Sequence, residues 1–324
     1  MIAVDLFSAT GLLTDETMRK ILVIGGSGGG KSSMVSVIFN QYAPHEVLHL
    51  KETDQCYAVV VPSTALVKLA IVDMPGHVLS QTSEVDPTIF EHAAAVTFVV
   101  DLETAGGSSD IQQGLAISKK VRDANPEAYL YFLLHKSDMS AEENAREVMV
   151  AIRSRLDRDG IRSRLQFFST SIYDKTIYVA WSTIVRRLVP SRDVLEELLS
   201  TLVHCSGLET GFLIDLRTRL TMGGVCTRQQ YSLASETLGL AIEMSDIYRP
   251  KDLPVDQPTR CFVQLTSGEC VYLREVAPCL AVVCVVREEN FDRQHLVRPL
   301  EAVDMQIDFN VQVFQRSLVD LYGL

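Results

Sequence analysis

The sequence contains no hydrophobic run of the length that a membrane span requires, about 18 residues. Its first residues, MIAVDLFSATGLL, carry no basic cluster ahead of an apolar stretch, so they do not resemble a secretory signal. Position 2 is Ile2 rather than the glycine that myristoylation needs, and the final LVDLYGL has no prenylation cysteine. We therefore expect a cytoplasmic protein that reaches a membrane only indirectly, through partners.

Basic residues are also scarce: there are 30 lysines and arginines against 41 acidic residues, which gives a formal net charge of −11. Nucleic acids and anionic membranes are bound through basic surfaces. The composition therefore argues against both kinds of partner, and we expect no nucleic acid. A length of 324 residues, of which 47% are hydrophobic, is nevertheless enough for two globular domains.

Cysteine is present, but in no pattern that indicates a metal site or a disulfide framework. The seven cysteines form no CxxC pair and show no Cys/His ligand spacing. Most of them stand in apolar runs, so we expect reduced, buried packing residues. They are Cys56, Cys205, Cys226, Cys261, Cys270, Cys279 and Cys284.

The first part of the chain, residues 18–190, alternates short apolar runs with longer stretches of helical period. This alternation is typical of an α/β domain with a doubly wound, mostly parallel sheet, here of six strands. The expected strands are residues 20–25, 56–61, 67–73, 95–101, 128–135 and 166–171. A last helix precedes Pro190, because Ile177, Trp181, Ile184 and Leu188 recur at helical spacing.

The pattern changes after Pro190, and we expect a second, α+β domain over residues 191–324. Its last three strands are separated by very short turns, which predicts an antiparallel meander. The expected elements are a helix at 193–204, strands at 211–216 and about 219–226, a helix at 228–243, strands at 261–266, 270–276 and 279–286, and a helix near 305–322.

The segment from Gly25 to Ser32 fits the pattern G-x-x-x-x-G-K-[ST], between an apolar strand and a helical stretch. In such a P-loop the glycines let backbone N–H groups surround phosphates, the lysine reaches the β and γ oxygens, and the hydroxyl binds Mg²⁺. The expected phosphate contacts are Gly28, Gly29, Gly30, Lys31, Ser32 and Ser33. A simple glycine-rich turn is the alternative, but it gives no reason for the strand, lysine and helix around it.

Two further elements complete a candidate metal and γ-phosphate site. Asp73 and Gly76 form a D-x-x-G motif at the end of an apolar strand, where the carboxylate can hold the metal and the amide can meet the γ-phosphate. Thr53, between the phosphate loop and the second strand, is the best-placed hydroxyl to ligate Mg²⁺ when GTP is bound. An ordinary turn aspartate and a solvated loop threonine remain the alternatives.

Base recognition is indicated by His135, Lys136 and Asp138, which follow the fifth strand as HKSD and match N-K-x-D with His for Asn. A carboxylate at Asp138 can accept hydrogen bonds from N1–H and the 2-amino group of guanine, which adenine does not offer. The Lys136 stem would lie over the base. The alternative for HKSD is a charged turn. The motif TSIYD (170–174) could offer backbone amides to guanine, and the alternative for this motif is a helix N-cap.

These strings together resemble the Rag GTPases, and more closely their C/D branch, from about residue 20 to 320. The resemblance rests on GKSS (30–33), LHLKETD (48–54), DMPG (73–76), HKSD (135–138), TSIYDKTIYVAWSTIVRRLVP (170–190) and LREVAPCLAVVCVVREENFDRQHLV (273–297). It implies that Ser171 and Ile172 join the guanine pocket, and that Thr53 is the switch I threonine.

The resemblance also implies a cellular role. It implies a roadblock-like second domain, an obligate heterodimer with an A/B-type Rag GTPase, and peripheral residence on the lysosomal or vacuolar membrane through a scaffold complex. It also implies amino-acid signalling to the TOR kinase complex.

Two departures from the family pattern concern hydrolysis. His77 stands where the C/D branch has Gln, the residue that orients the attacking water; His serves this role in the similar DCPGH of elongation factors. The loop GGSGGGKSS is unusually rich in glycine, and Ser27 can hinder an inserted arginine finger. We expect Lys31 and His77 to be catalytic and turnover to be slow. The alternative is a nucleotide-locked scaffold subunit that holds a partner GTPase. A translational GTPase is disfavoured by length and acidity.

Overall fold

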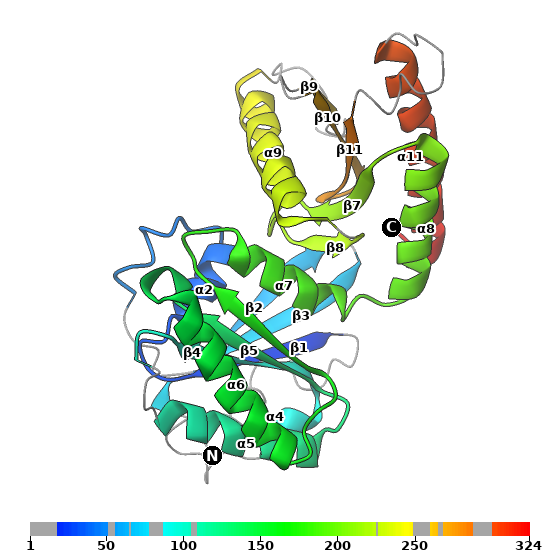
Figure 1. Ribbon diagram of the computed structural model, residues 1–324. Coiled ribbons are helices and arrows are strands. Elements are labelled where there is room, and N and C mark those ends of the chain that lie inside the picture. The colour runs from blue at the N-terminus through cyan, green and yellow to red at the C-terminus, as the bar shows by residue number, and fades with distance from the viewer. Residues whose placement is uncertain are drawn as a thin grey trace. The chain divides into compact units, whose positions relative to one another are not determined.

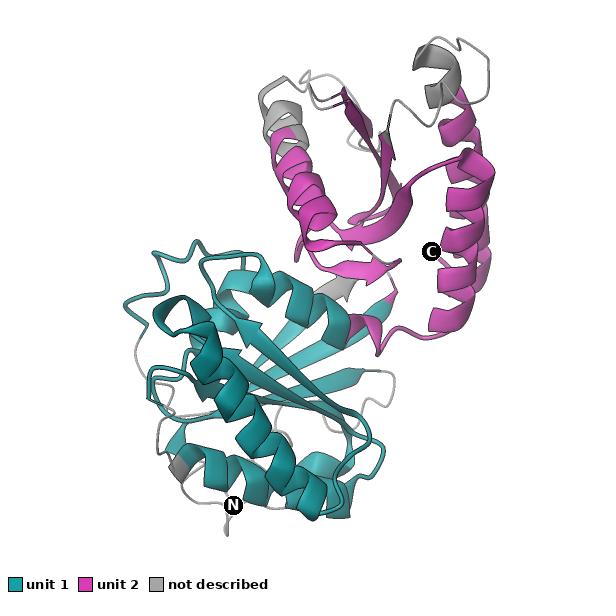
Figure 2. Cartoon of the chain, in the orientation of Figure 1, with its two compact units in different colours: residues 1–63, 67–184 teal, residues 64–66, 185–324 magenta. Residues whose placement is uncertain are grey.

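The computed structural model describes residues 18–50, 56–64, 66–77, 87–104, 109–224, 226–248, 260–264, 268–287 and 300–324. The chain divides into two compact units, residues 1–63 with 67–184, and residues 64–66 with 185–324 (Figure 2). The division falls within a few residues of Pro190, where the sequence pattern changes from α/β to α+β.

The first unit contains a six-stranded sheet in the order β2-β3-β1-β4-β5-β6. The five strands from β3 to β6 in this order pair in parallel, as a doubly wound sheet requires. The strands are β1 (Arg19–Gly25), β2 (Tyr57–Thr64), β3 (Val67–Asp73), β4 (Ala93–Asp101), β5 (Tyr129–His135) and β6 (Leu165–Thr170). The predicted α/β fold and its six strands are confirmed.

Helices cover both faces of this sheet (Figure 1). They are α2 (Lys31–Phe39), α4 (Thr88–Glu91), α5 (Ser109–Ala124), α6 (Glu142–Arg158) and α7 (Thr176–Arg186). On one face, β1 residues Leu22 and Ile24 share a buried cluster with Ile117 of α5 and Ile152 of α6. On the other face α2 lies against α7. Because strand side chains alternate between faces, one apolar run fills both cores.

The parallel arrangement brings the carboxyl ends of the strands to one edge of the sheet. Asp101 at the end of β4 is in register with His135 at the end of β5, which is in register with Thr170 of β6. β1 ends at Gly25 and β3 at Asp73 on the same side of the sheet. Open α/β sheets bind ligands at this edge, so the fold gathers the sequence motifs there.

The second unit contains a five-stranded antiparallel sheet in the order β8-β7-β11-β10-β9. Its strands are β7 (Thr210–Asp215), β8 (Thr221–Gly223), β9 (Arg260–Gln264), β10 (Glu269–Ala277) and β11 (Leu280–Arg287). Its helices are α8 (Arg192–Ser206), α9 (Arg228–Tyr248) and α11 (Leu300–Tyr322). In Figure 1, α8 and α11 lie together on one side of the sheet and α9 on the other. The predicted meander is confirmed as β9-β10-β11.

A polar network fastens α11 to this sheet. Asp308 of α11 accepts a hydrogen bond from the Tyr272 hydroxyl at 2.9 Å and pairs with the Arg274 guanidinium, both from β10. Burial opposes ionisation of Asp308, but its hydrogen bonds with Arg274 and Tyr272 outweigh this effect and lower its pKa. The anion is therefore the stable form in the folded unit.

We expected the cysteines to be buried, and this expectation is wrong for four of the seven. Cys205 is exposed at the end of α8, and Cys226, Cys261 and Cys279 are partly exposed, whereas Cys56, Cys270 and Cys284 are buried. Strand position explains part of this difference: Cys261 lies on the edge strand β9, while Cys284 lies on the central strand β11. Burial raises the pKa of Cys284 to about 12, so this thiol stays protonated.

Within the part of the chain that the structure describes, no helix is both long enough and apolar enough to cross a bilayer.

We predict that the contact between α2 and α7 is a major source of stability in the first unit. Trp181 is fully buried and meets Phe39 edge-to-face at 5.0 Å between ring centroids. Trp181→Ala should lower the free energy of unfolding by about 3–5 kcal/mol, because it leaves a cavity. Urea denaturation followed by circular dichroism measures this loss.

Val150→Ala is the control for this prediction, because Val150 of α6 is 58% exposed. It should change the free energy of unfolding by less than about 0.5 kcal/mol. Equal effects of the two substitutions would contradict the importance of the α2–α7 contact.

Candidate functional site

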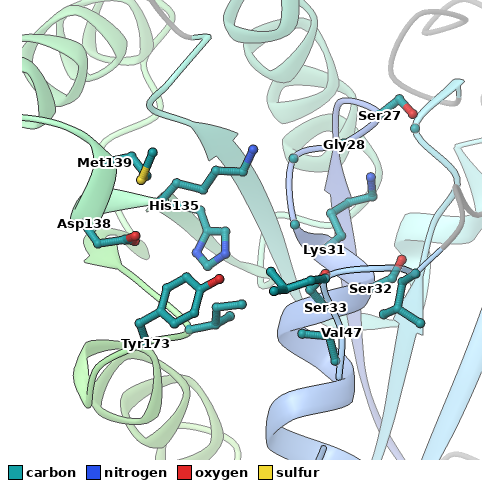
Figure 3. Close-up of a pocket in the computed structure, with 17 residues that line it drawn as sticks. Ser27, Gly28, Lys31, Ser32, Ser33, Val47, His135, Asp138, Met139 and Tyr173 are labelled. Atoms are coloured by element: carbon teal, nitrogen blue, oxygen red, sulfur yellow. The ribbon is translucent and has the colours of Figure 1, made fainter. Parts of the chain in front are cut away.

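A cavity of about 400 Å³ opens at the carboxyl edge of the parallel sheet (Figure 3). Five segments of the sequence form its wall: the phosphate loop, residues 47–50, Gly76 after β3, the end of β5 with the turn after it, and the loop after β6. The lining residues are Ser27, Gly28, Gly29, Gly30, Lys31, Ser32, Ser33, Val47, Leu48, Leu50, Gly76, His135, Lys136, Asp138, Met139, Ile172 and Tyr173.

The phosphate loop ends at the first turn of α2, and its backbone conformation requires glycine at two positions. Gly28 has φ +70° and Gly30 has φ +85°, both in the left-handed region. Lys31 is buried, and its Nζ donates a hydrogen bond to the Gly26 carbonyl at 2.9 Å. The loop therefore presents N–H groups, a helix N-terminus and one ammonium group to the cavity, which together favour an anion.

Neighbouring elements approach the loop so closely that side chains are excluded at several of its glycines. A Cβ atom at Gly30 would lie 2.6 Å from Cδ2 of His135, and one at Gly76 would lie 2.6 Å from Cα of Ser27. Real Cβ atoms do not tolerate such distances. Glycine is therefore a packing requirement at position 30 of the loop and at Gly76, which faces the loop.

Ser32 and Asp73 form the part of the site that suits a cation. The Ser32 hydroxyl donates a hydrogen bond to Oδ2 of Asp73 at 2.5 Å. Asp73 is only 2% exposed, and no hydrogen bond to its Oδ1 comes from the described residues. Burial raises the pKa of Asp73, while the hydrogen bond from Ser32 and the charge of Lys31 oppose the rise. A buried acceptor of this kind is stabilised by a hard divalent cation.

His135, the last residue of β5, is a buried, neutral imidazole. It is 2% exposed, and its Nδ1 shares a hydrogen bond with Oγ1 of Thr170 at 3.1 Å. Burial, helped by the nearby charge of Lys136, lowers the pKa of His135 to about 4. In Figure 3 its ring lies between the Asp138 carboxylate and the phosphate loop. His135 thus joins β5, β6 and the phosphate loop through one side chain.

Lys136 and Asp138 point into the cavity from the turn after β5. Lys136 adopts φ +60°, and its Nζ pairs with Asp101 at 2.7 Å and with Glu103 at 3.5 Å. Burial disfavours the ammonium form, but the hydrogen bond and charge of Asp101 outweigh this effect and raise the pKa of Lys136. Asp138 lies in the short 3₁₀ helix η3 (Ser137–Met139) and is exposed to the cavity.

Ser171 and Ile172, the two residues of the loop after β6 that the resemblance assigns to the guanine pocket, are placed differently from each other. Ser171 is 1% exposed and is not among the lining residues; its N–H donates to Oγ1 of Thr176 at 3.0 Å, and its Oγ accepts from the N–H of Tyr173 at 3.1 Å. Ser171 therefore orders the loop from behind. Ile172 and Tyr173 are the residues of this loop that reach the cavity.

Gly76, His77 and Thr53 are the remaining candidates for the γ-phosphate end of the site. Gly76 lines the cavity, and His77 follows it as an exposed residue outside the lining set. Thr53 lies outside the residues that the structure describes.

Several residues in or beside this cavity were not among the site residues expected from the sequence. Asp101, which holds Lys136, could have been found as an acidic residue at the end of an apolar strand. Tyr173 directly follows the motif Ser171-Ile172. The apolar residues Val47, Leu48, Leu50 and Met139 carry no comparable sequence signal.

We predict that the buried state of His135 makes folding sensitive to acid. The folded-state pKa is about 4 and the ordinary value is 6.5, so only the unfolded state binds this proton between the two values. Stability is therefore fully present above pH 6.5 and is lost as the pH falls toward 4, by about 3 kcal/mol in total.

The measurement is urea denaturation across this pH range for the wild type, His135→Asn and the control His92→Asn. Asparagine does not titrate, so His135→Asn should flatten the pH dependence relative to the wild type. The control substitution His92→Asn changes an exposed side chain and should leave the pH dependence of stability as it is in the wild type. Parallel profiles for the wild type and His135→Asn would contradict the prediction.

Comparison with known proteins agrees with this geometry. A family model described as the Gtr1/RagA G protein conserved region matches residues 20–240. Ras-related GTP-binding protein C of Homo sapiens is 29% identical over 325 residues, which cover 95% of this chain and 78% of that protein. GTP-binding protein GTR2 of Saccharomyces cerevisiae is 26% identical and covers 95% of this chain and 94% of its own length.

Ras-related GTP-binding protein A of Dictyostelium discoideum matches less of the chain: it is 28% identical over 181 residues, which cover 55% of this chain. The match to the C-type proteins, the D-type protein and GTR2 thus extends into the second unit. The chain belongs to the Gtr1/RagA family of GTP-binding proteins, in its Rag C/D branch, and is a GTPase.

Proposed function

We propose that this GTPase is a molecular switch that binds GDP or GTP with Mg²⁺ in the cavity at the carboxyl edge of the sheet, and that it hydrolyses GTP slowly. The observation that carries the proposal is the meeting of two distant segments in one cavity: Lys31 comes from the start of α2, and His135 and Asp138 come from the end of β5 and the turn after it. Lys31 would contact the phosphates of a bound nucleotide, and Asp138 would contact its base.

At the base end, the cavity offers a carboxylate to a partner that has two adjacent donors. Asp138 accepts from N1–H and the 2-amino group of guanine, whereas adenine offers an acceptor at N1. The Lys136 stem covers the base while its ammonium group is held by Asp101. The neutral His135 beneath them carries no charge that would compete for Asp138.

At the phosphate end, Ser32 and Asp73 are the residues that would hold Mg²⁺. When bound, Mg²⁺ neutralises charge on the β- and γ-phosphates. The buried Oδ1 of Asp73 and the Ser32 hydroxyl are oxygen ligands of the type that this ion prefers. We propose Thr53 as a further ligand that orders its segment only with GTP.

For hydrolysis, Lys31 stabilises charge on the transferred phosphate and Gly76 offers its N–H to it. We propose that His77, next to Gly76, orients the attacking water. Switch GTPases of this class turn over at about 10⁻³ s⁻¹ or less without an activator.

For assembly, we propose that residues 191–324 form a roadblock-like domain that joins an A/B-type Rag GTPase in a heterodimer. The alignment with the C-type relative over 95% of this chain, and the existence of A- and B-type relatives, support this proposal. We further propose a scaffold complex on the lysosomal or vacuolar membrane as the location, and amino-acid signalling to the TOR kinase complex as the output.

The second candidate function is a nucleotide-locked scaffold subunit. It is favoured by one feature, the position of His77: this residue is exposed and does not line the cavity, so a catalytic orientation would require the segment to move. Such a subunit would bind GTP through the same loops without turning it over.

The base-reading role of Asp138 is tested by Asp138→Asn. The amide presents a donor to the guanine 2-amino group, so GDP affinity should fall at least about tenfold, since a hydrogen bond to a charged group contributes about 1.5–3 kcal/mol. Xanthosine diphosphate has a carbonyl at that position, and its affinity should rise.

Titration calorimetry with both diphosphates measures these affinities. Asp123→Asn, an exposed aspartate of α5, carries the same charge change and should alter neither affinity. Unchanged guanine preference in Asp138→Asn would refute the base-reading role.

The two candidate functions are separated by multiple-turnover phosphate release, with and without an A/B-type partner. A switch should release phosphate over many turnovers, and His77→Ala should slow this release about tenfold or more without weakening GTP binding. A locked scaffold should release at most one equivalent per chain, with no effect of His77→Ala. Lys31→Ala serves as the inactive reference.

A further inference from the structure

An acidic residue from α5 lies against the outer side of the phosphate loop. A Cβ atom built on Gly26 would lie 2.1 Å from Oδ2 of Asp110 and 3.0 Å from its Cγ. Asp110 is in the first turn of α5, partly buried, and belongs to none of the sequence motifs that define the site. Its carboxylate therefore occupies the volume that a side chain at the second loop position would fill.

This contact places a negatively charged carboxylate beside the loop that is proposed to bind negatively charged phosphates. Gly26 also accepts the hydrogen bond from the Lys31 ammonium group, so the carboxylate and the phosphate-binding lysine approach the same residue. The other carboxylate of this end, Asp73, is already paired with Ser32. Two carboxylates, Asp73 and Asp110, thus stand beside the phosphate loop.

GTP carries about one more negative charge than GDP, and that charge lies at the phosphate end. A fixed carboxylate near the loop raises the free energy of the triphosphate complex more than that of the diphosphate complex. Ile117 and Val121 anchor helix α5 in the buried core, so the backbone that carries Asp110 is held in place.

We propose that Asp110 is a specificity-determining residue that biases this GTPase toward GDP by its charge on the outer side of the phosphate loop. This inference rests on the proposed function, because it assumes that the phosphates of GDP and GTP lie against this loop. It also explains the glycine at position 26, where any side chain would displace the carboxylate.

The charge is tested by Asp110→Asn, which keeps the shape of the side chain. Affinities for GDP and for the non-hydrolysable guanosine 5′-[β,γ-imido]triphosphate are measured on the full chain by fluorescence competition. The ratio of triphosphate to diphosphate affinity should rise roughly three- to tenfold at low salt. The rise should shrink toward about 1 M salt, where the screening length is about 3 Å. A purely structural role would not produce this salt dependence.

The matched control is Asp123→Asn on the same helix. It changes the net charge equally, but lies about 20 Å farther along α5 at 1.5 Å per residue, so the affinity ratio should stay constant. Asp110→Ala, a second variant, should raise the ratio in the same direction. An unchanged or lowered ratio in both Asp110 variants would overturn the proposal.

The contact itself is tested through Gly26. Gly26→Ala should weaken binding of both nucleotides, because its Cβ collides with Asp110, and the double variant Gly26→Ala with Asp110→Ala should recover most of the loss. If the double variant binds no better than Gly26→Ala alone, Asp110 does not lie against the loop and the proposal fails. Failure of the wild type to bind any guanine nucleotide would instead refute the proposed function.

Discussion

The close approach of neighbouring backbone and side chains to the phosphate loop is the constraint on which the rest of the site depends. At Gly30 the neighbour is His135, at Gly76 the phosphate loop itself is the neighbour, and at Gly25 it is the Val99 carbonyl, 2.5 Å from where a Cβ atom would lie. Each contact comes from a different strand end. A loop of unrestrained glycines would lose much backbone conformational entropy when it binds phosphate. These contacts restrict the loop before any ligand binds.

His135 transmits this constraint to the base-reading end of the cavity. Its ring touches the loop at Gly30, while its Nδ1 is held by Thr170 at the end of β6. Burial lowers the pKa of His135 to about 4, so the ring is neutral near pH 7. A shift of the phosphate loop therefore displaces the residue directly before Lys136. The phosphate and base ends of the cavity are coupled by packing rather than by a long chain of interactions.

Sequence reasoning predicted much of this arrangement because its signals are local. The six strands were readable as apolar runs, and the phosphate loop, the D-x-x-G motif and HKSD each follow a strand end, where an α/β sheet gathers ligand residues. The antiparallel meander of the second unit was readable from its short turns. The position of β11 between β7 and β10 was not, because pairing between β7 and β11 joins strands that lie far apart in sequence.

The same distinction separates the predicted site residues from those that were missed. Lys31, Ser32 and Asp138 are recognised by type and spacing. The contact between Ser171 and Thr176, by contrast, could not be read from the sequence. Asp101 and Tyr173 become site residues only when the sheet places them beside Lys136 and Asp138.

A division of roles follows from these contacts. The residues of the motifs have the types that phosphate, metal and guanine chemistry would require at this edge of the sheet. The residues around them determine how strongly each part is held: Asp101 fixes the Lys136 ammonium group, and Thr170 fixes the ring of His135. These surrounding residues lie outside the motifs themselves. Two GTPases with the same phosphate loop and base-reading box can therefore differ in nucleotide preference and turnover, and the physical cause must be sought at the ends of β4, β6 and α5.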